Sequence, residues 1–172
     1  MKLKFFIFVL FFTANLSAQQ YIIRAIPIIT NNDSAYTIRV QIKMGKSEET
    51  NLGNATMRFS YDSHELTYPN LPTKGIDYAF NLKNTGQYLC SVTKPEPGKI
   101  SINIYFKKGV PQIITNKYYN LVTIKFNKKK EFANFKINKY TAEIFSPNKQ
   151  KPWQLKIFLL GFQSNISSER MQ

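Results

Sequence analysis

Residues that could act on a substrate are few in this chain of 172 residues. Glycoside hydrolysis needs two facing carboxylates, and nucleophilic catalysis needs a hydroxyl or thiol beside a base. The ten acidic residues fall almost entirely at predicted turns or on predicted solvent-facing positions. They are Asp33, Glu48, Glu49, Asp62, Glu65, Asp77, Glu96, Glu131, Glu143 and Glu169. A polysaccharide hydrolase is the alternative only if two distant carboxylates converge in a cleft.

The single histidine and the single cysteine also argue against a catalytic or metal site. One Cys excludes a disulfide framework and a cysteine-based zinc site, and His64 alone argues against Ser-His-Asp chemistry. Cys90 lies in the strand-like run 88–92 with no base or cation cluster beside it, which favours core packing over a reactive thiol. We therefore predict no enzymatic activity, no cofactor and no metal site.

The chain is strongly basic, with 24 Lys and Arg against 10 Asp and Glu. Twenty of the cations are Lys and four are Arg, whereas proteins that read nucleic acids favour Arg for its bidentate contacts. The joint abundance of Lys, Asn and Ile is typical of an AT-rich genome. Attraction to an anionic surface polysaccharide or lipid is the functional interpretation. We expect no nucleic-acid partner.

The first 18 residues have the layout of a secretory signal peptide. Lys2 and Lys4 precede the apolar run 5–12, and Ala18 provides a small residue at the cleavage point. Eight apolar residues are too few to span a bilayer, which needs about 20, and no later run is long enough. The sequence therefore predicts a secreted or cell-surface protein without a transmembrane segment.

Most of the remaining chain alternates apolar and polar residues with a period of two, which predicts strands with one buried face. The alternating segments are 36–44, 55–61, 100–106, 121–126 and 155–160. This parity predicts that Phe59, Ile102, Ile104 and Val122 belong to the core. Residues 21–30 are also β-rich, but Pro27 should restrict them to an edge or split them.

Turn-forming residues separate these strands, as in the hairpin connection 94–99 and the loop 69–75. No window longer than ten residues carries a helical stripe, so almost no helix is expected. Eight to ten short strands with regular turns predict an all-β sandwich. The expected organisation is a signal peptide at 1–18, one domain at 19–163 and a frayed polar tail at 164–172.

The order of motifs resembles that of cohesin domains. In the cohesin signature a strand ends in Tyr-Asp, here Tyr61 and Asp62, and a Leu four residues after the Asp, here Leu66, starts the next strand. Residues 98–101 (Gly-Lys-Ile-Ser) resemble a further strand of the family, and residues 121–126 resemble its alternating penultimate core strand.

The resemblance runs from about residue 36 to residue 162 and implies an immunoglobulin-like or jelly-roll sandwich of about nine strands. Cohesins are scaffold modules that bind dockerins through one sheet face, and carbohydrate-binding modules share their superfamily. The implied function is a non-catalytic, exported bacterial binding module for adhesion or scaffolding, with a surface protein or polysaccharide as partner. The alternative is a carbohydrate-binding module that uses exposed aromatics. These are Tyr105, Tyr118, Tyr119, Tyr140 and Trp153.

If strand order follows the family, parity places one set of residues outward on one sheet. The set is Thr56, Arg58, Ser60, Ser101, Asn103, Tyr105, Tyr119, Leu121, Thr123 and Lys125. We predict binding by the members that combine aromatic rings, hydrogen-bonding groups and cations, as binding hot spots do. They are Arg58, Asn103, Tyr105, Tyr119 and Lys125. An ordinary solvated sheet face is the alternative.

Asp62 sits at the break between two strands, where its carboxylate can accept backbone N–H groups of the turn. This position predicts a structural role for Asp62. Calcium ligation is the other interpretation, although no second Asp lies close to it in the sequence.

We expect the exported protein to begin at Gln19, because the charged start and the Phe-rich run direct cleavage after Ala18. N-terminal sequencing of the exported protein measures this directly. Finding residues 1–18 on the exported form would contradict the prediction.

Overall fold

A computed structural model describes residues 20–28, 34–45, 49–83, 85–130, 137, 139–147 and 154–160. The predicted signal peptide and tail lie outside the described residues, and so does Trp153. The described residues form twelve strands. They are β1 (Gln20–Ile28), β2 (Ala35–Met44), β3 (Thr50–Asn51), β4 (Ala55–Ser60), β5 (Leu66–Thr67), β6 (Tyr78–Phe80), β7 (Tyr88–Thr93), β8 (Lys99–Phe106), β9 (Ile113–Ile114), β10 (Tyr119–Lys128), β11 (Tyr140–Ile144) and β12 (Gln154–Leu160).

Helix is nearly absent from the described part of the chain, as predicted. It is limited to one 3₁₀ turn, η1 (Thr85–Gln87). Across the described residues no helix has the length and apolar character needed to cross a bilayer.

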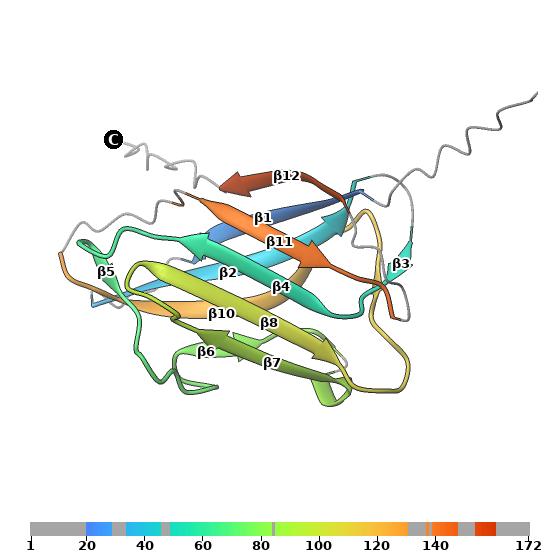
Figure 1. Cartoon of the computed structure of the whole chain (residues 1–172), viewed down its shortest axis with the longest axis horizontal. Helices are drawn as coiled ribbons and strands as arrows, with labels where there is room; N and C mark the ends of the chain where they lie inside the picture. Colours follow the sequence, from blue (N-terminus) through green and yellow to red (C-terminus); the bar gives the residue numbers. More distant parts are fainter. Residues whose placement is uncertain are drawn as a thin grey trace, which may run out of the picture.

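The strands pack as two layers, which confirms the predicted sandwich (Figure 1). The front sheet has the order β11-β4-β8-β7 and lies nearer the viewer. The back sheet has the order β12-β1-β2-β10-β5, with β6 also paired to β10, and β3 and β9 form a separate ribbon. β1 and β12 run parallel, whereas the other pairs of named strands are antiparallel.

The core lies between the two sheets and is built from the inward positions of the alternating strands. Ile102, Ile104 and Val122 are fully buried, and Phe59 is 4% exposed, so the predicted core residues are confirmed. Burial of each such side chain contributes about 1.5–3 kcal/mol. Tyr61 and Leu66 are buried as well, on either side of the turn that joins β4 to β5.

Buried tyrosines tie separate elements together through their hydroxyl groups. The Tyr21 hydroxyl donates to the Ala142 carbonyl at 3.0 Å and so links β1 of the back sheet to β11 of the front sheet. The Tyr88 hydroxyl donates to the Leu52 carbonyl at 2.6 Å and accepts the Gln112 N–H at 2.9 Å. Desolvation by burial is the main cause that raises the pKa of both phenols above the ordinary value, so both remain neutral donors.

Two local expectations need correction or refinement. Leu121 was expected to face outward but is fully buried, because the register between β10 and β2 shifts between Asn120 and Val122 and inserts one residue there.

β1 is an inner strand over Gln20 to Ala25, where it pairs with both β12 and β2. Among the described residues, Pro27 pairs with β2 alone, beyond the last described pair of β1 and β12, and its missing N–H suits such a position.

Replacing Phe59 by Ala should lower the free energy of unfolding by about 3–5 kcal/mol, because a buried ring is lost and a cavity remains. Urea denaturation measures the change. The control is Leu71→Ala, which removes an apolar side chain that is 90% exposed and should change stability by less than about 0.5 kcal/mol. A loss below about 1 kcal/mol for Phe59→Ala would contradict the inward placement of this ring.

Candidate functional site

The outer surface of the front sheet is a candidate binding surface, which we call the front face. It consists of the residues that alternate with the core positions of the four strands. They are Thr56, Arg58 and Ser60 on β4, Leu89, Ser91 and Thr93 on β7, Lys99, Ser101, Asn103 and Tyr105 on β8, and Thr141 and Glu143 on β11. Because the sheet fixes their spacing, these side chains form a regular grid.

Neighbouring rows of the front face have different chemistry. Thr56 pairs with Asn103, and the Thr56 hydroxyl donates to Asn103 Oδ1 at 3.3 Å. Leu89 pairs with Tyr105, and these two side chains are 57% and 51% exposed. Two large apolar neighbours in water form a small hydrophobic patch beside a polar row, a combination typical of protein-binding surfaces.

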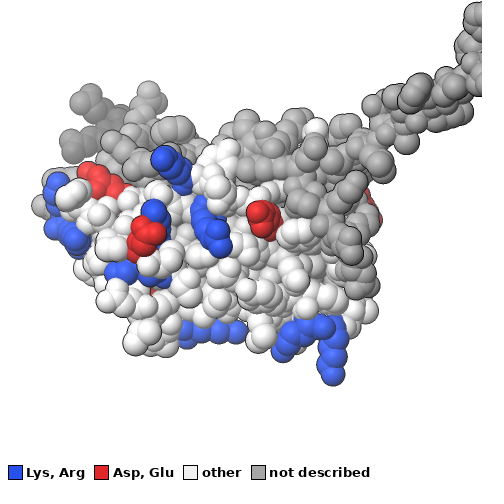
Figure 2. Space-filling view, viewed as in Figure 1, with Lys and Arg blue, Asp and Glu red and all other residues white. Residues whose placement is uncertain are grey.

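Charges are sparse on this side of the molecule and carry both signs. Figure 2 shows basic groups and fewer acidic groups on this side, some of them next to one another, with uncharged surface over much of the area between them. Arg58 and Lys99 supply cations on the front face, and Glu143 supplies an anion. Such a surface suits a partner with both charges and apolar groups, rather than a polyanion.

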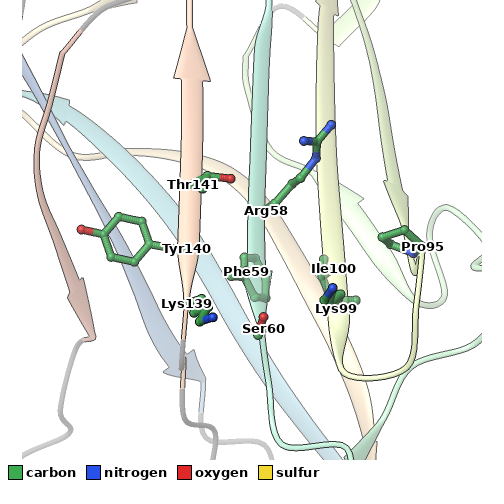
Figure 3. A pocket seen from close by; sticks show the side chains of 9 residues that line it. All are labelled: Arg58, Phe59, Ser60, Pro95, Lys99, Ile100, Lys139, Tyr140 and Thr141. Carbon is green, nitrogen blue, oxygen red and sulfur yellow. The ribbon is translucent and has the colours of Figure 1, made fainter.

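A shallow cavity of about 240 Å³ lies at the end of the front face where β4, β8 and β11 meet. Its lining includes Arg58, Lys99, Lys139 and Tyr140. Figure 3 shows Arg58 extending from β4 toward β8, whereas Tyr140 points from β11 away from β4. The Lys99 ammonium forms an ion pair with Glu96 at 2.7 Å, on the surface. The cavity offers cations to an acidic side chain of a partner.

The predicted binding residues do not share one face. Arg58, Asn103 and Tyr105 lie on the front sheet, whereas Tyr119 and Lys125 belong to β10 of the back sheet. Tyr119 also pairs with the buried Ile42 and packs against the core, so the prediction that it faces outward is wrong. Parity identifies which residues of a strand share one side, but it does not tell which sheet the strand joins. The single predicted surface is therefore wrong in this respect, and its members divide between two opposite sheets.

Three solved structures of cohesins from Acetivibrio cellulolyticus are similar to this chain in fold. The third ScaC cohesin, solved with the ScaB dockerin, is 12% identical with a TM-score of 0.53, over 81% of this chain and 93% of that one. The sixth cohesin of scaffoldin B, solved with a Cel5 dockerin, is 16% identical with a TM-score of 0.51, over 85% and 99%. A type II cohesin domain of the cellulosome is 12% identical with a TM-score of 0.53, over 79% and 91%.

The chain has a cohesin-like fold. No protein-family model matches its sequence, and no curated protein matches it either. The similarity therefore resides in the arrangement of the strands rather than in the identity of the residues.

In this cohesin-like domain, Asp62 stabilises the turn between β4 and β5. Its carboxylate Oδ1 accepts the His64 N–H at 2.8 Å, and its carbonyl accepts the N–H groups of Glu65 and Leu66. The Lys129 ammonium, in the residue that follows β10, donates to the Ser63 carbonyl at 2.8 Å and holds the same turn. Within the described residues there is no group of three or more His, Cys, Asp or Glu side chains that could hold a metal ion.

Residues of β11 were missing from the predicted surface, although parity could have found them. Ala142 packs against the core and Ile144 is buried, so Thr141 and Glu143 must face outward. Lys139 and Tyr140 contribute to the lining of the cavity because β11 pairs with β4. That pairing joins strands about 80 residues apart in the chain and leaves no local signal in the sequence.

Cys90 should react slowly with thiol reagents in the folded protein. It is partly buried and packs against the core, and burial raises the pKa of its thiol from 9.0 to about 12, an effect that Lys74 only partly offsets. At pH 8 this shift strongly lowers the thiolate fraction, so native labelling should be far slower than labelling in urea. Mass spectrometry of iodoacetamide-treated protein measures both rates, and equal rates would contradict the placement.

Proposed function

We propose that this chain is a non-catalytic, exported binding module whose partner is another protein, bound through the front face for adhesion or scaffolding. The observation that carries the proposal is a cohesin-like fold that presents an exposed Leu89–Tyr105 pair beside polar groups. Two of the similar cohesins were solved in complex with a dockerin, which is a protein ligand. The signal peptide predicted from the sequence supports export.

The geometry of the aromatics favours a protein partner over a flat aromatic platform for sugars. Tyr118 precedes β10 and Tyr119 begins it, so both belong to the back-sheet side, whereas Tyr105 lies on β8. Tyr140 shares the register of Phe59 and Ile100, about 16 Å along the strands from Tyr105. These rings are too scattered to stack on one saccharide together.

The front face supplies the elements of a protein-binding hot spot. Tyr105 provides a large amphipathic ring, Leu89 an adjacent apolar contact, and Arg58 a cation beside the cavity. The polar row of Thr56 and Asn103 supplies hydrogen-bonding groups between them. Such a centre is expected to lose water on binding, which makes its hydrogen bonds and charge contacts stronger.

The double change Arg58→Ala, Tyr105→Ala should weaken partner binding by about tenfold or more, because it removes the ring and the cation together. The partner is first captured from the exported and surface proteins of the producing cell by cross-linking to the full chain. It is then purified, and its affinity for each variant is measured by titration calorimetry.

Lys125→Ala is the matched control, since it removes a cation from the opposite sheet and should leave the affinity within about twofold. Circular dichroism verifies that both variants are folded. An unchanged affinity for the double variant, or an equal loss for Lys125→Ala, would contradict binding through the front face.

A further inference from the structure

The outer surface of the back sheet differs from the front face in its charge. Arg24 on β1, Arg39 and Lys43 on β2, and Lys125 on β10 all lie on this outward side, opposite the core positions of their strands. No acidic residue occupies a described outward position of these three strands. None of the four cations forms an ion pair with a carboxylate of the described residues. We call this surface the basic face.

A directed chain of hydrogen bonds crosses the basic face. Arg24 can only donate, and its Nε donates to Gln41 Oε1 at 2.6 Å. Because Gln41 Oε1 accepts this hydrogen bond, the other end of the amide carries the donor, and Gln41 Nε2 donates to Asn120 Oδ1. The Gln41 side chain is only 8% exposed. The Oδ1 of Asn120 is thereby occupied, which leaves the Nδ2 of Asn120 as a donor at the end of the chain.

The Tyr118 ring lies against Arg24, the first residue of these hydrogen bonds, and contacts a second cation. The Arg24 guanidinium lies 3.4 Å from the centroid of the Tyr118 ring, and the Lys43 ammonium lies 4.8 Å from it. Cation–π contacts of this kind contribute about 0.5–2 kcal/mol and fix the ring in place. The surface beside Tyr118 is therefore preorganised rather than loose.

A cavity of about 300 Å³ opens beside Asn120, the last residue of this series of hydrogen bonds. Its volume is at the low end of the size range of ligand sites. Its lining contains Lys83, Lys117 and Asn120, which can donate hydrogen bonds or attract anions. Asn81 and Gln112 also line it, and their NH₂ groups already donate to Thr123 Oγ1 and the Ile113 carbonyl. Their carbonyl oxygens are thus left as acceptors. No acidic residue is among the described residues of the lining.

We propose that this cavity binds a carboxylate-bearing sugar unit of an acidic polysaccharide. Lys83, Lys117 and Asn120 supply the donors that a carboxylate needs, and charge-assisted hydrogen bonds of this type are the strong ones. The side-chain oxygens of Asn81 and Gln112 accept hydrogen bonds from the sugar hydroxyls. The cations of the basic face then attract the neighbouring acidic units of the chain.

The lining favours a saccharide over a nucleic acid. A uronic acid needs both donors for its carboxylate and acceptors for its hydroxyls, and the cavity offers both within one small volume. A phosphate backbone offers almost only acceptors and is bound chiefly by cations, so its phosphates would leave the two acceptor amides without a partner. This site lies on the other sheet from the front face, so it goes beyond the proposed protein-binding function. The two proposals can be tested independently of each other.

The test uses the purified full chain and polygalacturonate, titrated by calorimetry at about 0.15 M salt, where long-range attraction between exposed charges is screened. Binding should be measurable, and the double change Lys83→Gln, Lys117→Gln should weaken it by about tenfold or more. The matched control is Lys107→Gln, Lys108→Gln, which removes the same charge from two exposed residues outside the lining and should change affinity by less than about threefold.

Further probes decide the ligand class. Fully methyl-esterified polygalacturonate keeps the hydroxyls and loses the charge, so it should bind about tenfold more weakly or not at all. Single-stranded DNA and anionic lipid vesicles carry charge without the sugar carboxylate and should bind more weakly than polygalacturonate. The proposal is overturned by absent polygalacturonate binding, by an equal loss in both double variants, by undiminished binding of the ester, or by tighter binding of DNA or vesicles.

Discussion

The alternation of inward and outward side chains along the strands is the constraint on which the rest of this structure depends. In β4, in β8 and in β10 beyond its bulge at Leu121, inward and outward positions alternate, and a shift of one residue in pairing would turn each strand over. Burial of Phe59, Ile102 and Val122 therefore also determines that Arg58 and Asn103 face solvent. The core selects the register, and the register places the candidate binding groups.

A sandwich that buries the inner faces of two sheets must present two separate outer faces, and here they differ chemically. The front face carries few charges of both signs and an exposed Leu89–Tyr105 pair. The basic face carries four cations and leads into a polar cavity beside Tyr118. Because the core separates them, one domain can present two different ligand surfaces without either interfering with the other.

The sequence predicted the fold and the core because both follow from local parity and turn chemistry. It could not assign Lys125 and Tyr105 to different sheets, since that assignment depends on pairings between strands distant in the chain. The burial of Leu121 could not be predicted, because a bulge in β10 interrupts the alternation and no residue type at this position indicates a bulge. The chain of hydrogen bonds from Arg24 to Asn120 was also hidden, since it joins three strands through cross-strand neighbours.

The central claim is that the two outer faces are separate ligand surfaces, and immobilisation through one face at a time tests it most directly. In a Cys90→Ser background, Tyr105→Cys and Lys117→Cys each provide one attachment point to a solid support, one on each face. We predict that attachment at position 105 abolishes capture of the purified partner and preserves polygalacturonate binding, whereas attachment at position 117 does the reverse. Loss of both ligands from either attachment, or retention of both, would contradict the account.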